Sequence, residues 1–274
     1  MHLLISASLM ISVMAAPLSV GELVAQLKGC EGLETCAPVK SLVKRGQSIW
    51  PELQVGLDAP DEMTRFWTLG VLSEVIIKDS RSAIARLLDD KKVRIRAAAA
   101  YALGAHRDKV VTPWLLKALS DKDLNVRFAA VVGLGRVRDP ASITPLKGAL
   151  RDQDEDVRAY AALALGDIRD LSATPSLIER LREDIKPQVR GFAAMALSKL
   201  KDPRSLKPLM AQAKDEKDAK ALAAALHALG ELGDIKALVL IEPHLRHSSP
   251  EVRDYAKDAI ATLKGAKKGS SGGK

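Results

Sequence analysis

The residues that most often carry out chemistry are few in this chain and are not grouped as an enzyme site requires. Its five histidines include no HExxH motif, and none is directly followed by a glutamate. His244 and His247 have a spacing that could hold a metal weakly on a helix end, but no thiolate or convincing carboxylate set accompanies them. There is no GxSxG or Walker motif. We therefore predict a non-enzyme without catalytic, cofactor-binding or metal-binding residues.

Cys30 and Cys36 are the two cysteines of the sequence, with five residues between them. In an exported protein, two cysteines this close together most simply form a disulfide. The bond would staple the turn between a predicted helix near 18–29 and another near 37–46. A redox pair or half of a metal site are the alternatives, although the spacing is not CxxC and no histidine lies near.

The first residues resemble a secretion signal. Residues 3–15 form an apolar run, and Val13-Met14-Ala15 fits the small-residue rule for cleavage before Ala16. The segment before the apolar run contains His2 but no lysine or arginine, so a short membrane anchor or a buried helix are alternatives. We expect a cleaved signal peptide over 1–15, a periplasmic or secreted protein, and no transmembrane span after cleavage.

A ten-residue pattern recurs seven times and must position any site that the chain has. Its clearest copy is Val157–Gly166, and the copies start at residues 64, 95, 126, 157, 189, 221 and 252, always 31 or 32 residues apart. A constant period of this length indicates a solenoid. We predict an all-α fold, a right-handed α-solenoid (alpha-alpha superhelix) of about seven helix pairs plus an N-terminal helical cap. After the signal, the predicted regions are a helical hairpin cap (16–47), the solenoid (48–263) and a disordered basic tail (264–274).

On a helix of about 100° per residue, the ten-residue pattern has one apolar face and one opposite face. In the copy at 157–166 the apolar face holds Val157, Ala161, Ala162, Ala164 and Leu165, and the opposite face holds Ala159, Tyr160 and Leu163. The many alanines predict close approach between helices. The glycine that closes the pattern is expected in the left-handed conformation that ends a helix; these glycines are Gly104, Gly135, Gly166 and Gly230.

The arginine at the second position of the pattern falls inside the apolar face and therefore needs a partner. Its copies are Arg65, Arg96, Arg127, Arg158, Arg190 and Arg253, while the sixth copy has Leu222. Four residues after each closing glycine or serine comes an aspartate that can also cap the next helix: Asp108, Asp139, Asp170, Asp202 and Asp234. We predict a structural ladder in which the arginines pair with these aspartates or with other acids in the turns. An anion-binding row of arginines is the alternative.

The face opposite the apolar one carries nearly all the aromatic residues of the repeats. We assign partner binding to a stripe along it, formed by Phe66, Trp67, Tyr101, Phe128, Val132, Tyr160, Leu163, Phe192, Met195, His227 and Tyr255. Exposed aromatics and methionines rimmed by mixed charge mark protein-binding surfaces. The alternative is ordinary packing between adjacent repeats, but alanine stands at the matching positions of repeats two and six, which favours binding.

Positive charge is concentrated in one part of the chain. The formal net charge is +8, and residues 91–151 hold thirteen basic residues against four acidic ones. This region could meet an acidic partner, nucleic acid or anionic lipid, or could be a solvated face without a target. The export signal argues against DNA.

The repeat Val-Arg-x-x-Ala-Ala-x-Ala-Leu-Gly, followed by an aspartate and a proline, resembles the HEAT-like repeats of the phycobilisome-lyase type. Val157–Gly166, Asp170 and Pro175 carry the resemblance, which covers roughly 60–262. It implies that the helix of the ten-residue pattern lines a concave surface. The expected function is an exported scaffold or adaptor that binds a protein or peptide there. A tetrapyrrole-handling protein similar to phycobilin lyases and a basic nucleic-acid binder are the alternatives. HEAT-like hydroxylases bind iron through His-Glu pairs, which this chain lacks.

Overall fold

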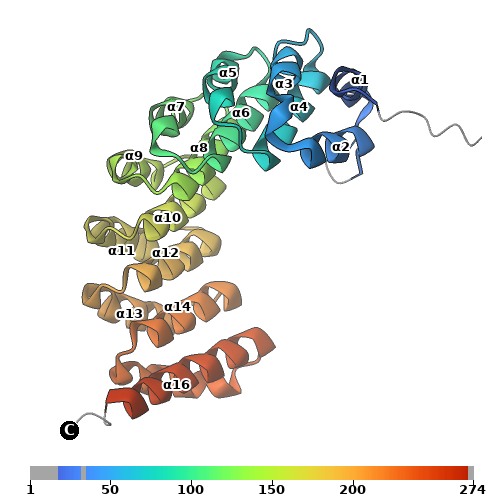
Figure 1. The fold of residues 1–274 in the computed structure, drawn as a ribbon. Coiled ribbons are helices and arrows are strands. Elements are labelled where there is room, and N and C mark those ends of the chain that lie inside the picture. Colours follow the sequence, from blue (N-terminus) through green and yellow to red (C-terminus); the bar gives the residue numbers. More distant parts are fainter. Residues whose placement is uncertain (1–17, 32–34, 271–274) are drawn as a thin grey trace, which may run out of the picture.

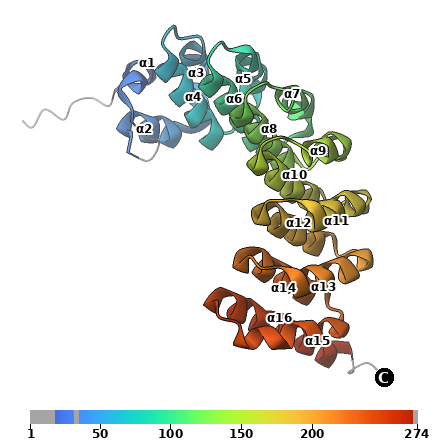
Figure 2. The same cartoon turned by 180° about the vertical axis from the view of Figure 1, so that it is seen from behind.

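The computed structural model describes residues 18–31 and 35–270, and this part of the chain is a curved stack of antiparallel helix pairs without any strand (Figure 1). The view from behind shows the same single arc (Figure 2). The predicted all-α solenoid of about seven helix pairs with an N-terminal helical cap is therefore confirmed. The predicted signal peptide, residues 1–15, lies outside the described residues.

Each repeat contributes one helix to an outer, convex layer and one to an inner, concave layer (Figures 1 and 2). The outer helices are α3 (Trp50–Leu57), α5 (Arg81–Arg86), α7 (Thr112–Ala118), α9 (Ile143–Ala149), α11 (Thr174–Glu183), α13 (Leu206–Asp215) and α15 (Leu238–Ile241). The inner helices are α4 (Glu62–Glu74), α6 (Val93–Ala105), α8 (Leu124–Val137), α10 (Glu155–Ile168), α12 (Pro187–Leu200), α14 (Ala219–Leu232) and α16 (Pro250–Ser270). The ten-residue pattern therefore lies on the inner, concave layer, as the family resemblance implied.

Local sequence explains where the inner helices begin and end. Asp154 caps α10, because its carboxylate accepts hydrogen bonds from the backbone N–H groups of Asp156 and Val157 at 3.0 and 3.1 Å. At the other end, Arg169 adopts the left-handed conformation (φ 62°) and its N–H donates to the carbonyl of Leu165. A short 3-10 turn then leads into the next outer helix, and equivalent turns cover Lys78–Ser80, Lys109–Val111, Pro140–Ser142, Leu171–Ala173, Pro203–Ser205 and Ile235–Ala237.

The closing glycines of the pattern do not end the helices, so this prediction from the sequence was wrong. The inner helices continue for one or two residues beyond Gly104, Gly135, Gly166 and Gly230. A Cβ atom on Gly166 would lie 2.8 Å from the Cα atom of Ala196 in the next inner helix. At Gly104, Gly166 and Gly230 consecutive inner helices therefore approach too closely for a side chain.

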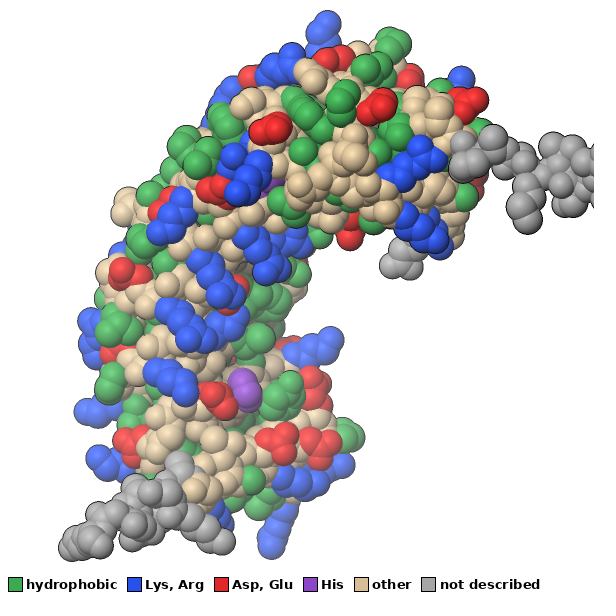
Figure 3. Space-filling view, viewed as in Figure 1, with side chains coloured by type: hydrophobic (Ala, Val, Ile, Leu, Met, Phe, Trp, Pro, Cys, Tyr) green, Lys and Arg blue, Asp and Glu red, His purple; other side chains and the backbone are tan. Residues whose placement is uncertain are grey.

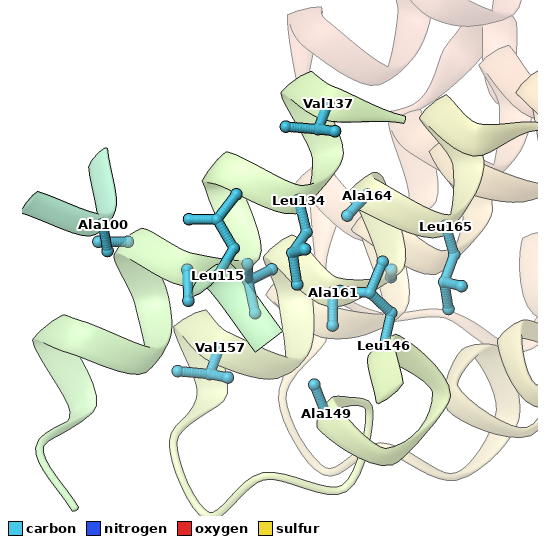
Figure 4. Close-up of a cluster of buried hydrophobic side chains, with 14 of the residues drawn as sticks. Ala100, Leu115, Leu134, Val137, Leu146, Ala149, Val157, Ala161, Ala164 and Leu165 are labelled. Atoms are coloured by element: carbon cyan, nitrogen blue, oxygen red, sulfur yellow. The ribbon is translucent and has the colours of Figure 1, made fainter. Parts of the chain in front are cut away.

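The core runs continuously between the two layers. Ala161, Ala164 and Leu165 of α10 are buried beside Leu134 of α8 and Leu146 of α9 (Figure 4). Ala159 was assigned to the opposite, non-core face, but it is fully buried as well. The reason is that α10 packs against an inner helix on both sides, α8 and α12, which widens its buried surface beyond a single stripe.

The N-terminal cap is a helical hairpin. It consists of α1 (Val20–Gln26), a 3-10 turn (Leu27–Gly29) and α2 (Ala37–Arg45), followed by a second 3-10 turn (Gly46–Ile49). A disulfide joins Cys30 and Cys36, whose Cα atoms are 5.3 Å apart. The predicted bond is thus present and closes the turn between the two helices.

The C-terminal end differs from the prediction. We expected disorder from residue 264, but α16 continues as a helix to Ser270. Each residue added to an existing helix gains a hydrogen bond without a new nucleation cost, which favours this extension. Residues 271–274 lie outside the described part. Over the described ranges, no helix combines the length and apolar character needed to cross a membrane.

Candidate functional site

The arginine at the second position of the pattern makes the same ion pair in five successive repeats. Arg158 donates from Nε and Nη2 to the two carboxylate oxygens of Asp184 at 2.8 and 3.0 Å, and from Nη1 to the carbonyl of Asp152 at 2.9 Å. We call these five pairs the arginine ladder: Arg65–Asp90, Arg96–Asp121, Arg127–Asp152, Arg158–Asp184 and Arg190–Glu216. Within the described residues, Arg253 donates to the backbone carbonyls of His247 and Ser248, and no acid pairs with it.

The acids of the ladder are not the five aspartates named from the sequence. They lie in the turn before the next inner helix, whereas Asp108, Asp139, Asp170, Asp202 and Asp234 lie after the inner helix, at its other end. The latter cap the 3-10 turns; Asp170, for example, accepts from the N–H of Ser172 at 2.7 Å. Asp202 also accepts from the hydroxyl of Thr174 at 2.7 Å, which ties two repeats together.

The charges of the ladder satisfy each other. Burial raises the pKa of Asp184, but hydrogen bonds from Arg158 and from the N–H of Lys186 outweigh it and hold that pKa below its ordinary value. At Asp121 the hydrogen bond from Arg96 is the largest influence, and it also lowers the pKa. The ladder arginines are therefore occupied by ionised carboxylates and do not form an anion-binding row.

The predicted stripe lies on the inner helices, and all but one of its side chains are at least partly exposed. Ten of its residues are half-buried or exposed on these helices: Phe66, Tyr101, Phe128, Val132, Tyr160, Leu163, Phe192, Met195, His227 and Tyr255. Trp67 is only 5% exposed, and its Nε1 donates to the carbonyl of Cys30 at 3.1 Å. Its assignment to a partner-binding surface was wrong, because the N-terminal hairpin packs against the first inner helix and buries this ring.

The middle of the stripe is a row of rings in contact. The ring centroids of Phe128 and Tyr160 are 4.7 Å apart, and those of Tyr160 and Phe192 are 5.4 Å apart. Such contacts contribute about 0.5–1.5 kcal/mol each beyond the area they bury. The rings of α8, α10 and α12 therefore pack between repeats while keeping part of their surface open on the concave side.

A first groove of about 930 Å³ lies against α4, α6 and α8. Phe66, Tyr101 and Phe128 line it, and the guanidinium carbon of Arg94 stands 3.9 Å above the Phe66 ring. Arg136 stacks on Tyr101 from the next helix, with its Nη2 donating to the phenol oxygen at 2.7 Å. The groove thus offers aromatic side chains held in place by arginines.

A second groove of about 720 Å³ lies against α12, α14 and α16. Its apolar and aromatic lining comes from Phe192, Met195, His227 and Tyr255, the last two with ring centroids 5.8 Å apart. Its rim carries charges of both signs: Glu155, Lys186, Asp218, Lys220 and Glu251. An apolar floor inside a polar rim is the usual anatomy of a protein-binding surface.

The basic region 91–151 is less free than its composition suggests. Five of its thirteen basic residues bind carboxylates: Arg96 and Arg127 in the ladder, Lys92 with Glu62, Lys117 with Asp89, and Arg151 with Glu179. Arg94, Arg107, Arg136 and Arg138 lie instead on or just after the inner helices. Figure 3 shows Lys and Arg side chains gathered in a column over the middle repeats, between the two layers.

One recurring feature was missed at the sequence level. A basic residue with positive φ stands at or just after the end of four successive inner helices: Arg107, Arg138, Arg169 and Lys201. The signal was present as a basic residue followed by aspartate, repeated at 107–108, 138–139, 169–170 and 201–202. We call these four residues the basic edge.

Among the described residues, no group of three or more His, Cys, Asp or Glu side chains is placed to hold a metal ion. The rings of His244 and His247 lie 6.1 Å apart, between α15 and α16.

Comparison with known proteins agrees with this architecture. A family model described as HEAT repeats matches residues 81–166, 112–197, 146–230 and 174–261, together more than half of the chain. No curated protein matches the sequence.

Three solved structures are similar in fold. YibA of Escherichia coli is 24% identical with a TM-score of 0.66, over 90% of this chain and 93% of that one. The CpcE–CpcF complex of phycocyanin lyase from a Nostoc species is 21% identical with a TM-score of 0.51, over 79% and 94%. A structure in which Kap95p binding changes the switch loops of RanGDP gives 13% identity and a TM-score of 0.60, over 89% and 41%. At these identities the likenesses concern the fold alone.

Proposed function

Because the chain belongs to the HEAT-repeat family, we propose that it is an exported, non-enzymatic scaffold or adaptor whose concave face binds a protein or peptide segment. The observation that carries the proposal is the second groove, where exposed Met195, His227 and Tyr255 form an open floor inside a charged rim. Met195 and Tyr255 are 37% and 38% exposed, so their apolar surface is available to a partner.

A protein of similar fold supplies a precedent for protein binding. Kap95p, which shares the fold, binds the protein RanGDP. Many contacts along a curved stack suit an extended or helical partner, because each repeat adds a small, similar area. In this chain the aromatic rings of α8, α10 and α12 and the two grooves lie along one layer, which fits a partner that spans several repeats.

Export is the second part of the proposal. It is supported by the apolar segment over residues 3–15 and by the disulfide between Cys30 and Cys36, a bond that persists in oxidising compartments. N-terminal sequencing of the protein from the periplasmic or secreted fraction tests it. A mature chain that begins at Ala16 is expected, whereas an intact Met1 in the cytosol would refute export.

A second candidate, the handling of a tetrapyrrole, is favoured by the first groove. Its volume of about 930 Å³ lies within the range of small-molecule sites, and aromatic rings and Arg94 surround it. Phycocyanin lyase shares the fold. Titration with bilin or heme tests this candidate: a saturable absorbance shift that is lost in Tyr101→Ser would favour it over the scaffold.

The scaffold proposal is tested best by placing a photo-crosslinking amino acid at Met195 in the full-length chain expressed in its own host. A discrete crosslinked adduct is expected at this position after irradiation, and mass spectrometry identifies the partner. Val239, which is 70% exposed on the outer helix α15, is the matched control, where no adduct is expected.

A second variant separates binding from folding. His227→Ser with Tyr255→Ser removes two exposed rings from the floor of the second groove, so the helical CD spectrum and the melting temperature should stay close to wild type. The adduct at Met195 should disappear. An adduct of equal yield at Val239, or one that survives this double substitution, would contradict binding on the concave face.

A further inference from the structure

The basic edge stands in an unusual backbone conformation. Arg107, Arg138, Arg169 and Lys201 have φ angles of 50°, 56°, 62° and 51°. Residues with a Cβ atom are disfavoured there by roughly 1–2 kcal/mol, and glycine is the usual occupant of this position at a helix end. The sixth repeat does carry Gly233 there, with φ 77°. The fold therefore accepts glycine at this position, yet four repeats keep a basic side chain.

The three arginines of the edge are each followed by an aspartate in the sequence but are not ion-paired with it in the described residues. In the described residues, no carboxylate forms an ion pair with Arg107, Arg138 or Arg169, and Lys201 reaches Glu231 only at 3.9 Å. This contrasts with the ladder, where every arginine from Arg65 to Arg190 has its own acid. The edge arginines are exposed, so they are available to an anion.

A pocket beside the edge brings charge and apolar surface together. Arg107, Arg136 and Arg138 line a pocket of about 360 Å³, which is completed by Tyr160 and Leu163 among others. The one acid in its lining is Asp167, which is already bound to Lys199 at 2.7 Å. The pocket thus suits a ligand that carries a carboxylate next to an apolar group.

We propose that the basic edge binds an acidic, extended segment of a protein partner, laid along the solenoid from α6 to α12. The proposal deepens the function proposed above and rests on it, because it names the chemistry of the segment that the scaffold receives. Carboxylates of the segment meet the edge residues, and an apolar side chain between them enters the pocket at Tyr160 and Leu163.

The spacing of the edge matches the repeat of an extended chain. Packed helices lie about 8–10 Å apart, so the edge presents one positive charge at about this interval. A polyproline II chain has three residues per turn and rises about 3.1 Å per residue, so equivalent residues recur every ~9 Å. An acid at every third position of such a segment would therefore meet successive edge residues.

A cation near the end of a helix also interacts favourably with the helix dipole. That interaction accounts for basic residues near a helix C-terminus in general. It gives no reason to hold them in the left-handed position itself, since the last helical turn would serve equally well. It also gives no reason for Arg107 and Arg138 of the edge to line one pocket together with Arg136.

The test uses a fluorescent synthetic peptide of four Glu-Leu-Pro triplets, which favours the extended conformation, and measures its anisotropy with the full-length protein. A peptide of the same composition with its four glutamates adjacent is the spacing control. A single-stranded DNA of the same length is the polyanion control. The spaced peptide is expected to bind at least tenfold more tightly than either control.

The matched variants keep folding and binding apart. Arg107→Gly, Arg138→Gly and Arg169→Gly together remove the charges and relieve the backbone, so the melting temperature should not fall while peptide binding drops at least tenfold. Arg182→Ala, Lys207→Ala and Lys214→Ala remove as much charge from exposed positions on α11 and α13 and should leave binding within threefold of wild type.

Each other outcome overturns the proposal. Equal losses in both variants would mean a diffuse charge effect, and equal binding of the spaced and clustered peptides would mean that spacing is irrelevant. DNA binding as tight as peptide binding and lost in the glycine variant would assign the edge to nucleic acid. If no peptide binds while the adduct at Met195 forms, this inference fails and the scaffold stands. If the adduct is also absent, both fail.

Discussion

Replacing Arg158 by methionine removes one rung of the arginine ladder while keeping a side chain of similar length. In the wild type, Arg158 satisfies both oxygens of Asp184 and also donates to the carbonyl of Asp152. After the replacement, Asp184 keeps the N–H of Lys186 at 3.0 Å, and the nearest guanidinium nitrogen of Arg180 lies at 3.7 Å. The substitution therefore leaves a charge in the interior with most of its compensation gone.

The size of the effect follows from this burial. The side chain of Asp184 is 2% exposed, and breaking a buried ion pair from one side costs about 3–5 kcal/mol. The remaining contacts place the expected loss of unfolding free energy near ~3 kcal/mol. Adding Asp184→Asn removes the charge but keeps an oxygen for Lys186. The double variant should therefore recover much of the loss, with a coupling energy of about 2–3 kcal/mol.

Urea unfolding followed by CD at neutral pH measures these free energies, provided that the m-value stays constant among the variants. Arg253→Met is the matched control, because this arginine has the same position in the pattern but donates only to the carbonyls of His247 and Ser248. It should cost about 1–2 kcal/mol. An equal cost at both positions, or a coupling energy near zero, would refute the idea that the acid stabilises the rung.

Three further predictions concern the rest of the solenoid. Gly104→Ala should lower the free energy of unfolding by about 1–3 kcal/mol in the same assay, because its Cβ atom would lie 2.4 Å from the Cα atom of Gly133. Gly148 faces open space, so Gly148→Ala should raise that free energy by about 0.5–1 kcal/mol. Equal effects of the two substitutions would contradict the close approach of the helices at Gly104. Reduction of the disulfide should raise the rate of amide hydrogen exchange in α1 and α2 by roughly 25-fold, because a disulfide that closes so short a loop stabilises by about 2 kcal/mol. The amides of α10, far from the disulfide in the chain, should stay protected. The melting temperature should fall as the pH drops below ~4. Folding lowers the pKa values of the buried ladder acids, so their stabilisation is complete above the ordinary carboxyl pKa and is lost as the pH falls through the pKa values of the folded state. A melting temperature that is constant down to pH ~2 would count against the ladder.

The repeat period was enough to predict the solenoid, because a period is a property of the sequence alone, whereas the inner position of the ten-residue pattern was implied by the family resemblance. The partners of the ladder required one more comparison between repeats. The acid follows its arginine by 25 or 26 residues, as in Arg158 and Asp184. In the sixth repeat both members change together, to Leu222 and His247. This paired change is a sequence signal for the contact, and it was overlooked.

Other features depend on how close two helices come, which local patterns do not reveal. Gly166 follows an apolar helical stretch and has the form of a helix end, and only the position of Ala196 in the neighbouring repeat explains it as a close contact. Trp67 has the same place in its repeat as Tyr160, but the hairpin at Cys30 covers it. Burial at the first repeat is therefore set by the cap and not by the repeat pattern.

The two sets of arginines in this chain have different physical tasks, and the difference bears on how a partner would be selected. The ladder ties the start of each inner helix to the turn before the next one, and so helps to fix the interval between successive repeats. The basic edge stands at the opposite, C-terminal ends of these helices, where its residues adopt the left-handed backbone conformation. Charges fixed in advance at a constant interval lose little freedom when a partner binds. A segment whose acids match that interval therefore gains affinity that an equal but differently spaced charge does not, so selection would rest on spacing more than on total charge.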